Sequence, residues 1–372
     1  MTLTRREFIG QLGVGALAAP FTASHSAPPT PFPFVDGLTF MGPPSEIAES
    51  GLSGFLLDVS SATRIPTTDG SVKFERTFDA CKNSMASALR LLNGGAGQAF
   101  HATKGGEIAE AHRTGRTAVL FQIQGGGEAV GSDLSRLAYF YTNGLRVFQI
   151  THHNDNSWGG GCIQERWTGL TRLGAEGVEQ LNALGIIPDL SHVSDPTSRD
   201  VIKASKKPVI ISHGGARALV NNARCAPDDV IKGVADSGGA MGIFMMTFWL
   251  TTEAAPTTES YLRQIRHVIN VGGIDAVGIA NDYPIGGEAN ARSLNNNNAK
   301  AIPSYFPFWD SVAKERVLGF GKRPTHVVIP ELNNPRRAHL IFAALEKAGY
   351  KPAEVEKIMG GNWIRVLKES LG

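Results

Sequence analysis

Short apolar runs alternate with amphipathic stretches along most of this chain. The runs have the length of β-strands, and they lie at residues 34–36, 54–59, 118–124, 147–151, 186–190, 209–211, 240–244 and 276–279. The stretches between them place apolar residues at helical spacing, and strands that alternate with helices predict parallel βαβ units. About eight such units, without a second composition regime, predict an α/β fold, a (β/α)8 TIM-type barrel. A doubly wound open sheet is the alternative, but the chain lacks a glycine-rich dinucleotide turn.

The amphipathic stretches predict helices at 74–92, 133–141, 173–184, 195–204, 228–236 and 258–271, with additional C-terminal helices at 336–347, 352–359 and 362–369. Asp195 is expected to cap the helix that it opens. The polar, asparagine-rich segment 290–302 is expected to be a surface loop that borders the mouth of the barrel.

Two neighbouring predicted strands end in the same dipeptide, Ser191-His192 and Ser212-His213. The carboxyl ends of parallel strands are where α/β proteins place their chemistry. Neutral imidazole is a common metal ligand, so two histidines in matched positions of one βαβ unit indicate a paired site. The alternative is a pair of capping or core histidines.

Other polar residues fall at the ends of further predicted strands. These are Gln124, His152 and Asp282, with Arg224 on the loop after the sixth strand. A carboxylate can accept a proton from an activated water, and an arginine can hold a carboxylate group of a ligand. Each residue also has a simpler interpretation, because Arg224 alone could be a surface arginine and Asp282 a loop cap.

Composition narrows the class of protein. Of 372 residues, 42% are hydrophobic and 19% charged, and the net charge is +2, from 36 basic and 34 acidic residues. Basic residues form no run longer than two, so we expect no nucleic-acid partner. No apolar run beyond the N-terminus is long enough to span a bilayer.

Cys81, Cys162 and Cys225 have no CxxC spacing. They therefore predict neither a disulfide framework nor a thiolate zinc cluster. We expect three buried small residues, while one bridge plus a free thiol stays open.

The N-terminal stretch Thr4-Arg5-Arg6-Glu7-Phe8-Ile9 has the twin-arginine pattern, followed by a weakly apolar segment. We interpret residues 1–27 as a twin-arginine signal segment with an approximate end, and residues 28–372 as a single domain. Export to the periplasm or the cell exterior is the expected localisation.

Several longer motifs run in order along the chain, among them DLSHVS at 189–194, KPVIISH at 207–213, GIAND at 278–282 and KIMGGNWIRVL at 357–367. With these motifs, the chain resembles the membrane (renal) dipeptidase family of zinc metallopeptidases over nearly its whole mature length. The resemblance implies a (β/α)8 barrel that cleaves dipeptides with a free carboxyl terminus, through a water that bridges two zinc ions. The implied partner is a small peptide substrate, and a homodimer is left open.

The resemblance also implies roles for individual residues. His192 and His213 match the ligands of the second zinc ion. His152 matches the histidine that contacts substrate and polarises the scissile carbonyl. Arg224 matches the arginine that holds the substrate carboxylate, and Asp282 matches the aspartate that acts as acid and base.

The chain departs from the family pattern at the first zinc ion. Leu38 and Phe40 stand where the first strand normally supplies a His-x-Asp pair, and neither can coordinate a cation. Gln124 stands at the bridging glutamate, and a neutral amide is a poor bridge between two cations. We therefore expect at most one zinc ion, held by His192 and His213, with Asp282, Gln124 or water beside them. Two displaced carboxylates that could compensate are Glu128 and Asp36.

Three functions are compatible with these residues. The first is a dipeptidase-like metallohydrolase with a reduced, mononuclear zinc site. The second is a catalytically silent barrel that binds a peptide or an amino-acid-derived ligand and has no metal. The third is a tailoring enzyme that acts on a peptide natural product.

Overall fold

The computed structural model describes residues 29–66, 68, 72–94, 97–164, 166–314 and 322–371. The twin-arginine segment lies outside the described residues, so the signal and its end stay predictions. Among the described helices, none is long and apolar enough to cross a membrane.

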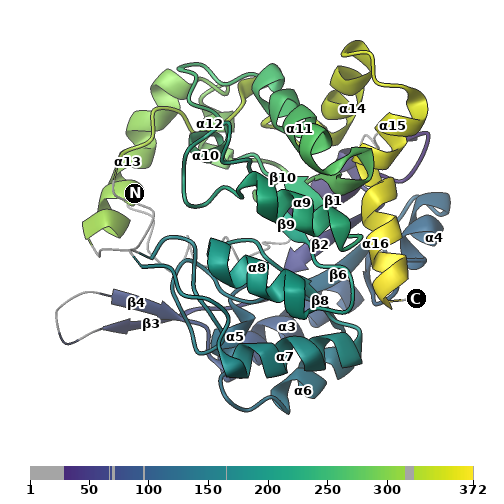
Figure 1. Cartoon of the computed structure of the whole chain (residues 1–372). Helices are drawn as coiled ribbons and strands as arrows, with labels where there is room; N and C mark the ends of the chain where they lie inside the picture. Colours follow the sequence, from purple (N-terminus) through teal and green to yellow (C-terminus); the bar gives the residue numbers. More distant parts are fainter. Residues whose placement is uncertain are drawn as a thin grey trace.

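Eight parallel strands in the described part of the chain form a nearly closed barrel with helices around it (Figure 1). They are β1 (Val35–Thr39), β2 (Gly54–Asp58), β6 (Thr117–Ile123), β7 (Leu145–Gln149), β8 (Ile187–Asp189), β9 (Ile211–Gly214), β10 (Met241–Ile243) and β11 (Val277–Ile279). Their hydrogen-bonded order is β8-β7-β6-β2-β1-β11-β10-β9. The barrel prediction is confirmed, and the doubly wound sheet is excluded. A further short strand, β5 (Ala99–Ala102), pairs with the start of β6.

The helices that follow the strands pack on the outside of the barrel. They are α3 (Phe78–Gly94), α4 (Glu107–Arg113), α6 (Arg136–Thr142), α7 (Arg172–Leu184), α8 (Asp195–Ala204), α9 (Asp228–Asp236), α11 (Thr258–Gly272) and α14 (Arg337–Lys347). Shorter helical pieces are α2 (Pro44–Ser50), α5 (Gly126–Val130), α10 (Thr247–Leu250), α15 (Pro352–Glu356) and the turns Ile274–Ala276, Pro330–Leu332 and Lys357–Gly361. The helices predicted at 173–184, 195–204, 228–236 and 258–271 are confirmed to within one residue at each end. Ser194 rather than Asp195 caps α8, because its hydroxyl accepts from the backbone N–H of Thr197.

Three further predictions about secondary structure were wrong. The helix predicted at 133–141 begins only at Arg136. The helix predicted from residue 74 begins only at Phe78, since Phe74 belongs to β4 (Val72–Glu75), which pairs antiparallel with β3 (Thr63–Pro66). The segment 290–302 is not a loop but lies in α12 (Ala289–Ser293) and α13 (Asn298–Lys314). Glu288, which precedes the segment, caps α12 by accepting its first backbone N–H groups. Asn298 links α13 to a distant loop by accepting from the backbone N–H of Val327 at 2.9 Å.

The last helix, α16 (Asn362–Leu371), packs against the barrel at the end opposite to the mouth. Its Trp363 is 1% exposed and donates from Nε1 to the carbonyl oxygen of Ile279 at 3.1 Å. Gly37 of β1 and Gly278 of β11 make room for the indole, because a Cβ atom on either would lie within 3.0 Å of it. The predicted C-terminal helix therefore covers one end of the barrel. The candidate site residues lie at the other end, where the strands have their carboxyl ends.

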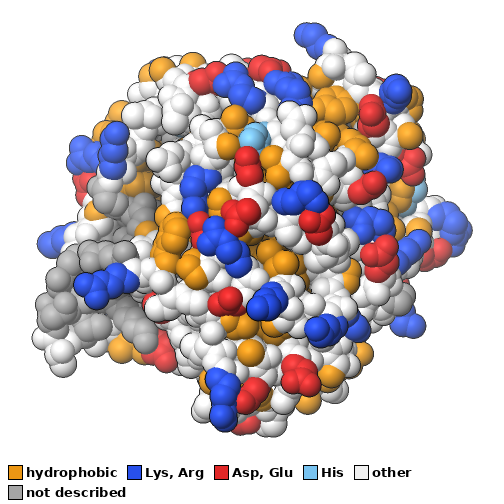
Figure 2. Space-filling view, viewed as in Figure 1, with side chains coloured by type: hydrophobic (Ala, Val, Ile, Leu, Met, Phe, Trp, Pro, Cys, Tyr) orange, Lys and Arg blue, Asp and Glu red, His pale blue; other side chains and the backbone are white. Residues whose placement is uncertain are grey.

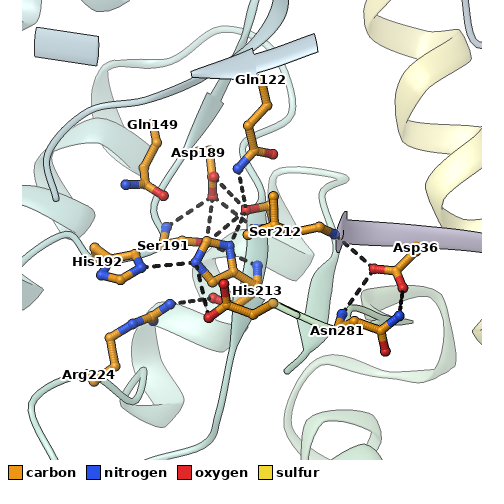
Figure 3. A network of polar contacts seen from close by, with 12 residues as sticks. Asp36, Gln122, Gln149, Asp189, Ser191, His192, Ser212, His213, Arg224 and Asn281 are labelled. Carbon is orange, nitrogen blue, oxygen red and sulfur yellow. Dashed lines mark hydrogen bonds and ion pairs between the residues drawn. The ribbon is translucent and has the colours of Figure 1, made fainter. Parts of the chain in front are cut away.

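Strands β8 and β9 are joined by few backbone contacts, through an isolated bridge between Asp189 and Ile210. A buried carboxylate adds to this join, and we call the set the Asp189 clasp (Figure 3). Oδ1 of Asp189 accepts from the backbone N–H and hydroxyl of Ser191 at 3.0 and 2.9 Å, and from the backbone N–H of Ser212 at 2.9 Å. Oδ2 accepts from the Ser212 hydroxyl at 2.6 Å. The clasp therefore adds four side-chain hydrogen bonds to the backbone bonds that join β8 and β9.

Asp189→Asn should destabilise the protein, because the amide nitrogen cannot accept and at least one buried donor loses its partner. We expect the free energy of unfolding to fall by about 3 kcal/mol, measured by urea denaturation. The matched control is Asp236→Asn, at an exposed carboxylate that pairs with Lys232 along α9. If the two variants unfold at the same urea concentration, the clasp does not hold β8 to β9.

Candidate metal and substrate site

The structure brings together five of the predicted site residues at the carboxyl ends of the strands. The rings of His152 and His192 stack with centroids 4.1 Å apart. Nε2 of His192 lies 3.0 Å from Nε2 of His213, and Asp282 Oδ2 lies 4.0 Å from the same His213 atom. Arg224 reaches the group through Nη2, which donates to the backbone carbonyl of His213 at 3.2 Å (Figure 3).

The Asp189 clasp determines which nitrogen of His213 carries the proton. The Ser212 hydroxyl donates its hydrogen to Asp189, so its oxygen is left to accept from Nδ1 of His213 at 2.8 Å. We therefore assign the proton of neutral His213 to Nδ1, which leaves the Nε2 lone pair facing His192. A hydrogen-bonded second nitrogen of this kind is typical of histidines that bind metals.

The His192 and His213 nitrogens suit one divalent ion. Their rings are inclined by 60°, and the two Nε2 atoms lie 3.0 Å apart, close enough to bind the same ion. Both rings are buried, and a carboxylate is close by. Two imidazole nitrogens and a carboxylate oxygen form the mixed donor set that zinc accepts.

His192 and Asp282 both have left-handed backbone conformations, with φ of 63° and 57°. Non-glycine residues rarely adopt this conformation, and the surrounding contacts hold it here. The carbonyl of His192 accepts from the backbone N–H of Cys162 at 2.9 Å, and the backbone N–H of Asp282 donates to Leu38 at 2.9 Å. The local turn directs each side chain into the mouth.

His153 was missed by the sequence interpretation. Its ring is 7% exposed and lies 4.7 Å from the ring of His192 and 4.3 Å from that of His152. Ligand atoms of these three histidines all lie within 4.8 Å of one another. The adjacent pair His152-His153 was a visible signal, but sequence alone does not show that both rings face the same side.

Arg224 is 4% exposed, and several neighbouring groups contact it. Its guanidinium carbon lies 5.2 Å from the centre of the Phe244 ring and 5.7 Å from that of Trp249. Its backbone N–H donates to the Asn222 side chain at 2.8 Å. Within the described chain, the buried Nε has no hydrogen-bond partner, so it can still donate to an anionic group. These contacts exclude the interpretation of Arg224 as a surface arginine.

A second arginine supports the loop that carries Arg224. Arg217 donates to both carboxylate oxygens of Asp195, at 2.5 and 2.7 Å. Its guanidinium also donates to the backbone carbonyls of Ala223 at 3.4 Å and Cys225 at 2.7 Å, on either side of Arg224. Asp195 begins the helix after His192, so this pair, which we call the Asp195–Arg217 strut, couples the loops after β8 and β9.

Burial shifts the titration of the site residues. It lowers the pKa of His152, His192 and His213 well below the ordinary value, with a contribution from the positive charge of Arg224. The imidazoles are therefore neutral at pH 7 and can bind a metal ion. Burial raises the pKa of Asp282 to about 7, although Arg224 opposes the rise. Asp282 thus exchanges its proton near neutral pH, as an acid and base group requires.

The two side chains that the sequence analysis placed at the first zinc position are part of the hydrophobic core. Leu38 is fully buried and Phe40 is 6% exposed. Asp36 cannot replace them, because its carboxylate accepts from the backbone N–H groups of Leu38 and Asn281, both at 3.0 Å, and from the Asn281 side chain. Burial raises the pKa of Asp36 to about 7.

Gln124 and Glu128 complete this side of the mouth. The backbone N–H of Gln124 donates to Asp58 at 3.2 Å, and the side chain is 6% exposed. Glu128 lies in α5, where Oε2 accepts from the backbone N–H of Arg76 at 2.9 Å and lies 3.8 Å from its Nη1. Among the described residues, the potential metal cluster therefore contains histidines and neither of the two displaced carboxylates.

Cys81, Cys162 and Cys225 are buried and unbridged, as expected. Burial raises the pKa of each thiol to about 12. They are neutral at pH 7 and do not act as thiolate ligands.

A (β/α)8 barrel with neutral histidines, a buried aspartate and a buried arginine at its mouth defines a barrel of the metallohydrolase type. Sequence comparison identifies the family. The sequence pattern of the membrane dipeptidase family, peptidase family M19, matches residues 71–304, which is more than half of the chain. The chain belongs to this family of metallopeptidases.

Relatives and solved structures agree with this assignment. Dipeptidase tcpJ of Claviceps purpurea is 29% identical over 274 residues, which are 72% of this chain and 54% of that protein. The chain spans about half the length of this curated relative. An amidohydrolase from Pseudomonas aeruginosa has a TM-score of 0.73 at 27% identity, over 92% of this chain and 97% of that one.

A metallopeptidase from Rhodobacter sphaeroides has the same fold, with a TM-score of 0.71 at 19% identity. The match covers 91% of this chain and 99% of that one. That structure holds a phosphinate mimic of the dipeptide L-Ala-D-Ala.

Arg217→Ala should loosen the loop around Arg224, because the four hydrogen bonds from the Arg217 guanidinium to backbone carbonyls of Asn222, Ala223 and Cys225 would be lost. Hydrogen exchange of the amides at 222–226 should become at least about 10-fold faster. The control is Arg199→Ala, which removes an exposed ion pair with Asp229 between α8 and α9. Equal exchange in the two variants would contradict the role of the strut.

The stability of the metal-free protein should respond to Asp36. Its pKa is about 7 in the folded state, against about 4 in unfolded chains. The folded state therefore keeps a proton that the unfolded state releases, so this group stabilises the fold below about pH 4, and its contribution is lost as the pH rises through 7. Asp36→Asn should remove this contribution, so the stability of the wild-type protein relative to the variant should decline between about pH 4 and about pH 7. An unchanged difference would contradict it.

Proposed function

We propose that this chain is a dipeptidase-like metallohydrolase. It cleaves the peptide bond of dipeptides with a free C-terminal carboxylate and uses one zinc ion held by His192 and His213. The observation that carries the proposal is the pair of Nε2 atoms, 3.0 Å apart, beside Asp282 and Arg224. Membership of the membrane dipeptidase family supports the reaction class.

When bound, zinc supplies Lewis-acid polarisation, which makes water nucleophilic near neutral pH. The chain's own residues do the remaining work. Arg224 binds the substrate carboxylate through its buried guanidinium, and this orients the dipeptide across the histidines. Phe244 and Trp249 keep that guanidinium in place.

Proton transfer falls to Asp282. Its pKa of about 7 allows Oδ1 or Oδ2 to take a proton from the attacking water and to return it to the leaving amine. His152 is neutral at pH 7, so it can donate a hydrogen bond to the carbonyl oxygen as negative charge develops there. One ion and these three side chains are enough for hydrolysis.

A silent barrel is the second candidate, and the apolar first-zinc position favours it. Leu38 and Phe40 are buried in place of ligands, and Gln124 replaces a carboxylate. In that case Arg224 would still hold the carboxylate of a peptide or of an amino-acid-derived ligand without turnover. Chemistry on a peptide natural product would use the same Arg224 contact.

Export also belongs to the proposal. The twin-arginine pattern at Arg5-Arg6 supports transport of a folded protein to the periplasm or the exterior. Folding before transport would allow the histidines to take up metal in the cytoplasm.

Metal analysis combined with a dipeptide hydrolysis assay tests the proposal. The wild-type protein should hold about one zinc ion per chain, and chelation should abolish turnover. His192→Ala should lose the ion and the activity. The control is His267→Ala, at a histidine on α11 that pairs with Asp228. Zinc-free protein that hydrolyses no dipeptide, but binds one through Arg224, would support the silent barrel instead.

Asp282→Asn separates proton transfer from metal binding. We expect kcat to fall by about 100- to 10,000-fold with zinc content unchanged, because the amide cannot accept the proton. Asp275→Asn removes an exposed carboxylate that pairs with Lys357 and should leave kcat unchanged. Full turnover in Asp282→Asn would contradict the assignment of the acid and base.

A further inference from the structure

Asp58 is a carboxylate inside the barrel that the proposed mechanism does not use. It is the last residue of β2 and pairs in register with Gln122 of β6, so both side chains point to the same face of the sheet. That face is the interior, because the Gln122 amide nitrogen donates to the hydroxyl of Ser212 on the non-adjacent strand β9 at 3.3 Å. Asp58 therefore faces the inside of the barrel at the carboxyl end of its strand.

Three hydrogen bonds hold the Asp58 carboxylate in place. Oδ1 accepts from the backbone N–H groups of Ser60 at 2.8 Å and Gln124 at 3.2 Å, and Oδ2 accepts from the Ser60 hydroxyl at 2.8 Å. A carboxylate has about four lone-pair sites, so Oδ2 can accept a further hydrogen bond. The residue is partly exposed, and buried Trp363 covers the opposite end of the barrel, so Asp58 is open to the mouth.

The charges around Asp58 make this side of the mouth negative. Arg76 is near, but its Nη1 lies 3.8 Å from Oε2 of Glu128, so it also balances that second carboxylate. Burial raises the pKa of Asp58, and the hydrogen bonds from Ser60 and Gln124 and the charge of Arg76 oppose the rise. Two carboxylates and one guanidinium favour a cationic ligand group here.

The positive side of the mouth lies across from Asp58. Arg224 is on the loop after β9, and the strand order β9-β10-β11-β1-β2 places β2 and β9 opposite each other in a ring of eight strands. Asp282 follows β11, midway between them, and both charges act on it: Asp58 raises its pKa and Arg224 lowers it. A dipeptide with free ends carries opposite charges of its own, separated by about 7 Å of extended chain.

The cationic group that suits Asp58 is an ammonium rather than a second metal ion. A divalent ion needs several ligands at once, and among the described residues the group that could hold a metal contains only histidines. An ammonium has three N–H donors and can be bound by one carboxylate together with neighbouring acceptors.

We propose that Asp58 binds the free α-ammonium group of a dipeptide whose carboxylate is held by Arg224. Asp58 is then a residue that determines specificity: it selects dipeptides with a free amino terminus over the same peptides with an acylated one. The inference rests on the proposed function for the role of Arg224, and it deepens that function by naming what recognises the other end of the substrate.

Binding of Ala-Ala and of N-acetyl-Ala-Ala to the full-length protein tests the inference, measured by calorimetry with a chelator present so that no peptide is cleaved. The wild-type protein should bind Ala-Ala at least about 10-fold more tightly, because a hydrogen bond between charged groups contributes this much. Asp58→Asn should lose the preference. Its affinity for N-acetyl-Ala-Ala should stay at the wild-type value, which also shows that the mouth of the variant is folded.

The matched control is Asp133→Asn. Oδ1 of Asp133 accepts from the backbone N–H and the hydroxyl of Ser135 at 3.2 and 2.5 Å, much as Asp58 accepts from Ser60, but Asp133 is exposed and precedes α6 on the outside of the barrel. This variant should keep the preference for Ala-Ala. In the zinc-loaded protein, Asp58→Asn should lower kcat/KM for Ala-Ala by about 10-fold or more, and Asp133→Asn should not.

The outcomes separate this inference from the proposed function. Equal binding of the two peptides by the wild-type protein, or a preference that persists in Asp58→Asn, overturns the role of Asp58 even if dipeptides are hydrolysed. A preference that depends on Asp58 in a protein that hydrolyses neither peptide supports the role of Asp58 and contradicts the proposed function. A wild-type protein that binds neither peptide overturns the role of Asp58, and the hydrolysis assay then decides the proposed function alone.

Discussion

The buried carboxylate of Asp189 is the interaction on which both the barrel and its site depend. It accepts four hydrogen bonds from Ser191 and Ser212, where β8 and β9 share little backbone pairing. The same bonds leave the Ser212 oxygen to accept from His213, which turns the Nε2 lone pair of that ring toward His192. One side chain therefore both helps to hold β8 to β9 and orients the ring of His213.

The mouth of the barrel has two unlike sides. Toward β7, β8 and β9 it presents neutral imidazoles, and toward β1 it presents Leu38 and Phe40. Leu38 and Phe40 bring no unpaired charge into the buried interior, where one would cost several kcal/mol. The neutral Gln124 fits this explanation, and Asp36 avoids the cost through its hydrogen bonds and its raised pKa. Figure 2 shows Lys and Arg interspersed with Asp and Glu on the face in view.

Most of the fold could be predicted because apolar runs and helical spacing report burial directly. The eight strands and the helices near 195–204 and 228–236 came from such local patterns. The errors lie in segments where the hydrophobic pattern fits more than one type of secondary structure. Phe74 fits a helical stripe, but it pairs with Arg64 across β3 and β4. The polar segment 290–302 is largely helical, with α12 capped by Glu288 and Asn298 bonded to the distant Val327. Long-range packing overrides the local preference at these positions.

By itself, the sequence determined the barrel, the two Ser-His strand ends and the uncharged side chains at Leu38, Phe40 and Gln124, because each is a matter of residue type and order. Tertiary structure decided which side chains meet. It placed His153 against His192, embedded Arg224 between Phe244 and Trp249, and engaged Asp36 with Asn281. Such contacts depend on ring orientation and on strands distant in the chain, which the order of residues does not specify.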